Sequence, residues 1–274
     1  MKGFIKRVIP VAICLFSLLL CCCANQQQEK TDTEENRQVE KKVTQGLATE
    51  GTWNGVTYQY NEDTRTLTVS GKIIKGTIDG ADAFSWEDDD KIPWGKWRRD
   101  IKELVLEEGV ECVTHGAFGY FIDLREIRFP ETLKEIGWCA FYNSAQDMKK
   151  LELPDSVEEI GDSAFSRRYP TDKGFEQIRL PKKLRRIGRA AFDSQLLTSI
   201  TIPENVEEIG NWAFGECYWL ETVTVKSKKI KKAGELLFQH TNDELAIYVP
   251  KEREKKYREM LGQTDGHVYP MKEK

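Results

Sequence analysis

Histidines and one acidic run are the residues of this 274-residue chain whose types could support catalysis or hold a metal. The histidines, His115, His240 and His267, have no zinc-ligand spacing, and no HExxH, GxSxG or phosphate-loop motif is present. His115 and His240 fall at polar positions of the repeat described below, which predicts solvated side chains. The chain is therefore expected to carry no catalytic residue, no metal site and no cofactor.

The acidic run Glu87–Asp90, with Asp79 and Asp82 nearby, could offer carboxylates to calcium. It lacks the ligand spacing of an EF-hand, which favours a solvated acidic loop. An enzyme with its site in residues 76–100 is the alternative to a protein without catalytic activity.

The cysteines divide into two groups. Four of the seven, Cys14 and Cys21–Cys23, lie in the N-terminal segment. The others, Cys112, Cys139 and Cys217, are odd in number and stand at different phases of the repeat, which predicts buried free thiols, with a disulfide as the alternative.

The elements that must position any site come from a phrase of about fifteen residues, such as LELPDSVEEIGDSAF, that recurs along the chain. The copies start at Leu104, Ile127, Leu151, Ile178, Ile200 and Val223, and a last strand, IYVP, starts at Ile247. These starts are 23, 24, 27, 22, 23 and 24 residues apart. A fixed period in this range predicts a solenoid, in which each coil buries its apolar side by stacking on its neighbours.

One coil has a readable order of parts. Alternating apolar residues, such as Leu151 and Leu153, predict a short strand, and Pro154 has no N–H with which to continue it. Gly161 follows an apolar pair, which we interpret as a bend, and an Ala-Phe pair closes the phrase. The fold class expected is thus a right-handed, β-rich coil with a parallel strand ladder over residues 104–250.

Charged pairs support the register of the stack. The pairs Glu158-Glu159, Arg185-Arg186, Glu207-Glu208 and Lys231-Lys232 hold equivalent positions in successive coils. Opposite signs would then meet between neighbouring coils, and a slip by one coil would set like charges together. Solvated positions that alternate by chance are the alternative.

Both ends of the solenoid need caps, because a terminal coil exposes an apolar layer. Residues 51–103 are expected to form an N-terminal cap, with a β-hairpin around a polar turn and an irregular segment pinned by tryptophans. Residues 251–274 are expected to form a C-terminal helical cap and tail, with a helix over 251–261.

The N-terminus predicts export. A basic start and an apolar run of thirteen residues, Val8 to Leu20, have the shape of a signal peptide over residues 1–23. The cysteines that follow resemble a bacterial lipoprotein signal, which implies lipidation at Cys23 or Cys22, with an ordinary cleaved signal as the alternative. Residues 24–50 are polar and free of aromatics, which predicts a disordered tether.

The unit LxLPxxVxxIGxxAFxxCxxL resembles the BspA-like class of leucine-rich repeats, and the resemblance covers nearly all of residues 51–261. The chain departs from that unit at Glu107 and Lys226, where proline is expected, and has cysteine at only one of the positions three after the phenylalanine. The resemblance implies a cell-surface or secreted protein of recognition and adhesion type, and it brings no catalytic residues.

Two surfaces are candidates for binding. The first is the column of outward residues at the middle of successive strands: Arg128, Glu152, Arg179, Thr201, Thr224 and Tyr248. The second is a set of aromatics at polar phases, which predicts exposed rings: Trp138, Trp212, Tyr218 and Trp219. Packing over loop edges is the alternative for these rings.

The resulting hypothesis is a non-enzymatic, lipid-anchored recognition or adhesion protein of the bacterial outer membrane or cell surface, binding a host or bacterial surface protein. A glycan-binding accessory lipoprotein that uses the aromatics is the second hypothesis, and a purely structural role also stays open. The net charge of −4 and the absence of a basic block argue against nucleic acid. The capped ends predict a monomer.

Overall fold

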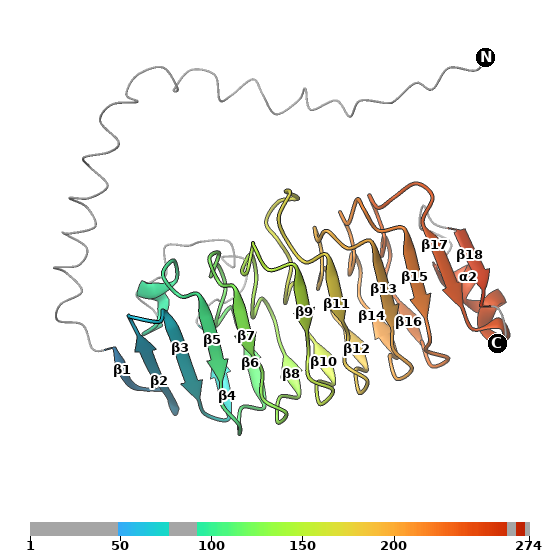
Figure 1. Cartoon of the computed structure of the whole chain (residues 1–274). Coiled ribbons are helices and arrows are strands. Elements are labelled where there is room, and N and C mark those ends of the chain that lie inside the picture. Colours follow the sequence, from blue (N-terminus) through green and yellow to red (C-terminus); the bar gives the residue numbers. More distant parts are fainter. Residues whose placement is uncertain (1–48, 77–91, 262–266, 272–274) are drawn as a thin grey trace, which may run out of the picture. The chain divides into compact units, whose positions relative to one another are not determined.

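The structure, a computed structural model, describes residues 49–76, 92–261 and 267–271. The predicted signal peptide, its Cys22 and Cys23, almost all of the tether and the acidic run Glu87–Asp90 lie outside the described residues. From Thr49 onward the chain forms one unit in which successive coils follow one another in chain order (Figure 1).

Each coil begins with a strand of what we term the first ladder. These strands are β5 (Glu103–Leu106), β7 (Glu126–Arg128), β9 (Lys150–Glu152), β11 (Gln177–Arg179), β13 (Ser199–Ile202), β15 (Thr222–Val225) and β17 (Ala246–Val249). Neighbours pair in parallel and in repeat register, as Ile200 with Val223 and Val223 with Ile247. The parallel ladder predicted from the repeat is therefore confirmed, and strands such as β13 end where the proline follows.

The first ladder is not continuous. It divides into three sheets, with strand orders β1-β2-β3-β5-β7, β9-β11 and β13-β15-β17-β18. Breaks thus lie between β7 and β9 and between β11 and β13, and the coil that separates β11 from β13 is the shortest, with 22 residues from Ile178 to the next start at Ile200.

A second parallel ladder, which the sequence analysis did not predict, runs without a break through the repeats. Its strands are β4 (Ile73–Lys75), β6 (Cys112–Thr114), β8 (Glu135–Ile136), β10 (Glu159–Ile160), β12 (Arg186–Ile187), β14 (Glu208–Ile209) and β16 (Lys232–Ala233). Most are only two residues long and come from the polar-apolar pair before the repeat glycine. Such short segments carry no periodic signal of their own, since alternation needs at least four residues to be read.

Stacked phenylalanines form the centre of the core. The rings of Phe141, Phe165 and Phe192 stack in sequence with centroids 5.3 and 5.6 Å apart and planes within 3° of parallel. The column continues through Phe118, Phe214 and Phe238. One ring per coil at the coil spacing explains why the Ala-Phe pair recurs.

A row of buried polar side chains lies three residues after these phenylalanines. Ser144 Oγ donates to the Phe118 carbonyl (2.6 Å), and Gln195 Nε2 donates to the Phe165 carbonyl (2.7 Å). Cys217 Sγ, which is fully buried as predicted, makes the same contact to the Phe192 carbonyl at 3.3 Å. Each bond satisfies a buried carbonyl of the preceding coil, which lets Ser, Gln and Cys share one position.

The repeat glycines lie where neighbouring coils come into close contact. They do not form bends, and the interpretation of Gly161 as a bend was wrong. Gly188 has no positive φ, but a Cβ on it would lie 2.4 Å from the carbonyl carbon of Gly161 and 2.5 Å from the Asp162 nitrogen. The turn is made two residues later, where Ala190 and Ser163 have φ of 51° and 53°. The glycine is needed because adjacent coils touch there through their main chains.

The charged positions alternate as expected. In the second ladder Glu159 pairs with Arg186 and Arg186 with Glu208. Glu207, the residue before Glu208, forms ion pairs with Arg185 in the preceding coil (3.3 Å) and with Lys231 in the following coil. The predicted meeting of opposite signs between coils is confirmed.

The N-terminal cap consists of β1 (Glu50–Trp53), β2 (Val56–Asn61) and β3 (Thr66–Ser70), joined as two antiparallel pairs. The hairpin around the polar turn is confirmed, and β3 then pairs in parallel with β5. Trp94, just before the 3-10 helix η2 (Gly95–Trp97), is fully buried, donates from Nε1 to the Ala117 carbonyl (2.9 Å) and stacks on Phe118. Trp94 thus extends the column of stacked rings from Phe118 into the N-terminal cap.

The C-terminal cap contains the predicted helix, observed as η3 (Lys251–Arg253) followed by α2 (Glu254–Leu261). Tyr257 is buried, and its hydroxyl accepts from the Ile230 N–H and donates to the Ser227 carbonyl. The predicted tail holds one more strand, β18 (His267–Pro270), which pairs in parallel with β17 and adds an unpredicted rung to the first ladder.

Candidate functional site

The column of outward residues on the first ladder lies where the repeat places it. Arg179 sits beside Glu152, and Thr201, Thr224 and Tyr248 follow one another in register. All six members of the column are exposed except Thr224, which is half-buried. The face formed by these residues is called the strand face below.

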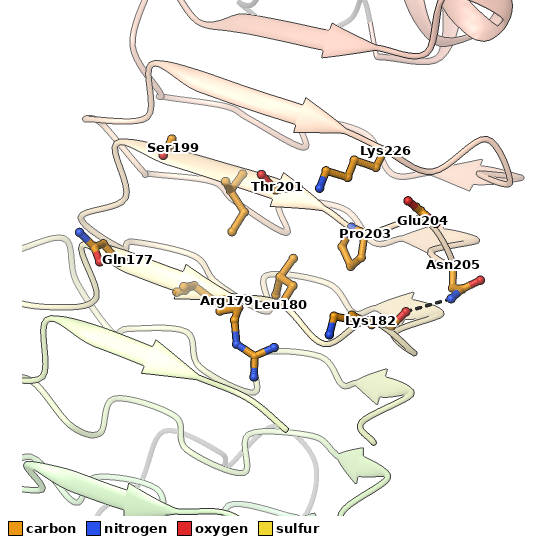
Figure 2. A pocket seen from close by; sticks show the side chains of 12 residues that line it. Gln177, Arg179, Leu180, Lys182, Ser199, Thr201, Pro203, Glu204, Asn205 and Lys226 are labelled. Carbon is orange, nitrogen blue, oxygen red and sulfur yellow. Dashed lines mark hydrogen bonds between the residues drawn. The ribbon is translucent and has the colours of Figure 1, made fainter. Parts of the chain in front are cut away.

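A groove of about 550 Å³ opens on the strand face between β11 and β13 (Figure 2). Arg179 and Thr201, two members of the predicted column, line it from neighbouring strands. Its volume lies within the range of roughly 300–1,000 Å³ that is usual for ligand sites. The groove was not predictable from the repeat, because it exists only where two strands of the ladder fail to pair.

The floor of the groove is apolar. Leu180 and Ile200 are buried beneath it, Ile178 is half-buried, and Pro203 forms part of the wall (Figure 2). Leu180 and Ile200 belong to the continuous core of the solenoid, and Ile178 packs against it, which holds the floor rigid.

Main-chain groups on both sides of the groove point into the gap. The main-chain N–H of Gln177 donates to the Lys149 carbonyl, next to β9, and the main-chain carbonyl of Arg179 accepts from the Leu153 N–H. Because successive residues of a strand face opposite sides, the N–H and C=O of Ile178 face β13. By the same alternation, those of Ser199 and Thr201 face β11. Within the described part of the chain, no hydrogen bond joins the two strands.

Positive charge gathers along the rim. Arg179, Lys182 and Lys226 line the groove together with one acid, Glu204. Asp155, outside the groove, accepts from Arg179 and from Lys182 at 2.8 Å each, and these cations hold the pKa of its carboxyl well below its usual range. Asp155 therefore offsets part of the charge of both Arg179 and Lys182.

Of the three cations that line the groove, Lys226 is the one for which no ion pair is found among the described residues. It occupies the position that holds proline after most other strands of the first ladder. Its N–H donates to the Ile202 carbonyl at 2.9 Å, a bond that proline could not make. Figure 2 shows its side chain extending from the end of β15 toward Thr201 on β13. This departure from the repeat was visible in the sequence, although its role was not.

The aromatic candidates do not form one surface. Tyr218 and Trp219 are exposed, at 48% and 62%, as predicted. Trp138 and Trp212 are half-buried, so the alternative of packing at loop edges describes them better than exposed rings do. Trp138 packs on the buried cluster of Tyr120, Cys139 and Tyr142. Trp212 lies against the His240 ring, with centroids 6.3 Å apart.

A smaller hollow of about 310 Å³ lies beside Trp138 on the second ladder. Its lining includes His115, Glu159, Asp162 and Arg186, and the last two form an ion pair of 3.1 Å. His115 is half-buried and hydrogen-bonded to the Thr114 hydroxyl, so its ring is only partly solvated.

The histidines and cysteines of the described residues differ in their surroundings. His240 is exposed, as expected, and contacts Glu216. Cys112, Cys139 and Cys217 are free thiols, although Cys112 is half-buried instead of buried. Burial raises the pKa of the Cys112 and Cys139 thiols to about 12, which makes them poor nucleophiles. Across the described ranges, no group of three or more His, Cys, Asp or Glu side chains could hold a metal.

One carboxyl near the loop edge titrates abnormally. Burial raises the pKa of Asp193 to about 7, and the neighbouring charge of Glu216 acts in the same direction, against a hydrogen bond from Ser194. Asp193 Oδ1 has no hydrogen-bond partner. The folded protein therefore keeps a proton that the unfolded chain releases near pH 4, so stability falls as the pH rises from about 4 to 7.

Replacement of Asp193 by asparagine is expected to raise the free energy of unfolding at pH 8 by about 1–2 kcal/mol, because no carboxylate then has to be buried. At pH 4 the gain should vanish, since the native carboxyl is neutral there. Urea unfolding at both pH values measures this, with Asp243→Asn at an exposed position as the control. An equal gain at both pH values would contradict the explanation.

No described helix is long and apolar enough to cross a membrane.

Comparison with known proteins gives a family. The model of the BspA type leucine rich repeat region matches residues 96–173 and 169–260, in 6 copies. A search of curated proteins finds no match.

Several solved structures are similar at low identity. A leucine-rich cell surface protein of Faecalibacterium prausnitzii is 18% identical with a TM-score of 0.39, over 66% of this chain and 55% of that one, so this chain spans about half of its length. A leucine-rich repeat protein of Bacteroides ovatus is 17% identical with a TM-score of 0.27, over 81% and 76%. The leucine-rich repeat protein of T. pallidum is 15% identical with a TM-score of 0.33, over 78% and 97%. Because the family model matches more than half of the residues of this chain, the chain belongs to the BspA-type leucine-rich repeat family.

Proposed function

We propose that this chain is a non-enzymatic recognition protein that binds a protein partner through its strand face. The observation that carries the proposal is the outward column, which runs across successive coils and opens into the groove between β11 and β13. A repeat solenoid offers a wide, rigid surface of this kind, and such surfaces suit macromolecular partners.

The setting that we propose is the bacterial outer membrane or cell surface, with a lipid anchor at Cys23 or Cys22. The support is the order of the sequence: a basic start, an apolar run and a cysteine cluster, followed by a polar tether. The F. prausnitzii relative is described as a cell surface protein, which agrees with this setting. We further propose that the capped solenoid is a monomer.

A second candidate function, glycan binding, is favoured by the exposed rings of Tyr218 and Trp219. They stand next to each other in the chain, away from the groove lining, and aromatic faces stack on sugars. Trp138 and Trp212 are too enclosed to add to this surface.

The test is an array of surface proteins, matrix proteins and glycans probed with the full chain in a nonionic detergent. Binding to protein spots should fall at least about tenfold for Tyr248→Ala and Arg128→Glu on the strand face, the size of effect seen when an interface anchor is lost. Lys232→Glu, on the second ladder, should leave it unchanged.

Signal on glycan spots that disappears with Trp219→Ala would support the second candidate instead. Absence of signal on protein and glycan spots alike would contradict both.

A further inference from the structure

We infer that the groove between β11 and β13 binds an extended acidic segment of a partner polypeptide, with a small apolar side chain seated on its floor. This inference rests on the proposed function and names the chemistry of the partner. Three independent features of the groove lead to it: its main-chain groups, its floor and its charge.

The first feature selects a polypeptide. The main-chain N–H and C=O groups of Ile178, Ser199 and Thr201 face one another across a gap that no hydrogen bond spans. Main-chain donors and acceptors that alternate along a strand edge match those of an extended peptide. An unpaired main-chain group is costly unless water or a ligand satisfies it. Cα atoms of β11 and β13 lie within 8 Å of each other, so a peptide main chain does not fit between the two strands; a bound peptide lies over the gap and directs polar groups at this edge.

The second feature selects an apolar anchor. Leu180 and Ile200 lie buried under the groove and Pro203 forms its wall, while no aromatic residue lines it. Because successive side chains of an extended peptide point in opposite directions, one side chain can enter the floor while its neighbours point to the rim. A branched aliphatic side chain suits a floor made of leucine, isoleucine and proline.

The third feature selects negative charge. Three cations and one acid line the groove, although the whole chain carries a net charge of −4. Asp155 offsets part of the charge of Arg179 and Lys182, which leaves Lys226 available to a ligand carboxylate. The guanidinium of Arg179 is turned toward β9, where it also donates to the Leu153 carbonyl at 2.8 Å. A peptide with acids on both sides of its apolar residue could therefore reach Lys226 on one rim and Lys182 on the other.

The main-chain groups and the charge of the groove distinguish it from the hollow beside Trp138. That hollow is lined by the acids Glu135, Glu159 and Asp162 with Arg186, so an acidic segment would be repelled there. It also lies on the unbroken second ladder, where the main chain is fully paired between coils.

The experiment uses fluorescein-labelled, amidated heptapeptides in which glutamate alternates with valine, leucine or isoleucine. Their glutamine twins and lysine twins are the matched probes. Fluorescence anisotropy with the full chain in nonionic detergent should show the best glutamate peptide binding at least about tenfold more tightly than its glutamine twin. Its affinity should fall as salt rises, because rim charges are screened. Lysine twins should not bind.

Variants then locate the site. Lys226→Glu should weaken the glutamate peptide about tenfold or more, and Thr201→Tyr should weaken it by filling the groove without a change of charge. Both residues are exposed, so both variants should keep the circular dichroism spectrum and melting temperature of the native protein. Lys75→Glu, an equal charge change at an exposed position on β4, should alter affinity less than twofold.

The inference is overturned if glutamate and glutamine peptides bind equally, if none binds, or if Lys75→Glu weakens binding as much as Lys226→Glu. These outcomes differ from failure of the proposed function. A protein on the array that is lost with Tyr248→Ala but retained with Lys226→Glu and Thr201→Tyr would keep the strand face as a binding surface and remove the groove from it.

Discussion

Truncation of Phe192 to alanine is expected to lower the free energy of unfolding by about 3–5 kcal/mol. The ring is fully buried, and it stacks on both Phe165 and Phe214 with centroids 5.6 Å away in each case. Its removal leaves a cavity in the middle of the column, with two unstacked faces. In a solenoid each coil gains stability only from its neighbours, so a defect in a central coil weakens the interfaces on both sides.

Urea unfolding followed by circular dichroism measures this effect. Phe192→Leu keeps most of the volume and should cost only about 1–2 kcal/mol. Tyr169→Ala, which removes an exposed ring, should cost less than about 0.5 kcal/mol. Equal losses for Phe192→Ala and Tyr169→Ala would contradict the phenylalanine column as the centre of the core.

Addition of a single methyl group at Gly188 is expected to destabilise the protein by about 3 kcal/mol. In Gly188→Ala the new Cβ would lie 2.4 Å from the Gly161 carbonyl carbon and 2.6 Å from Asp162 Oδ1. The main chain cannot yield cheaply here, because the Gly188 N–H donates to the Ile160 carbonyl at 2.7 Å within the second ladder. Relief of the clash therefore has to separate two coils.

The matched control is Gly55→Ala in the turn between β1 and β2. A Cβ there would meet nothing within 4 Å, although φ is 78°. Only backbone strain of about 1 kcal/mol is expected. Thermal and urea unfolding of both variants compare the two causes, and a Gly55→Ala variant less stable than Gly188→Ala would show that conformation, and not contact between coils, explains the repeat glycines.

The repeat made much of the fold predictable. Period-two pairs such as Leu151 and Leu153 placed the strands of the first ladder, and the proline that follows marked their ends. The alternation of Arg185 with Glu207 and Lys231 predicted the register between coils. These features share one property: each is local in the sequence and is repeated, so chance is averaged out.

Other features required the tertiary structure. Strands such as β10 and β12 contain two residues and exist only because neighbouring coils supply their partners. The role of Gly161 depends on the distance to Gly137 in the preceding coil, which no local pattern contains. The groove depends on the missing pairing between β11 and β13, a property of how coils of unequal length stack.

Two further features of the sequence correspond to parts of the structure. Asn54-Gly55 is the dipeptide typical of a two-residue hairpin turn, and both residues have positive φ between β1 and β2. Lys226 replaces a repeat proline and is the rim cation of the groove. A departure from the repeat can thus draw attention to a position that stacking does not explain, because the repeat itself encodes stacking.

The most direct test of the proposed recognition role is hydrogen–deuterium exchange of the full chain, alone and with the protein captured on the array. Partner binding at the groove predicts slower main-chain exchange over residues 177–203, where Ile178, Ser199 and Thr201 lack partners in the free protein. Slower exchange confined to residues 215–221, around Tyr218 and Trp219, with no change over 177–203, would contradict it.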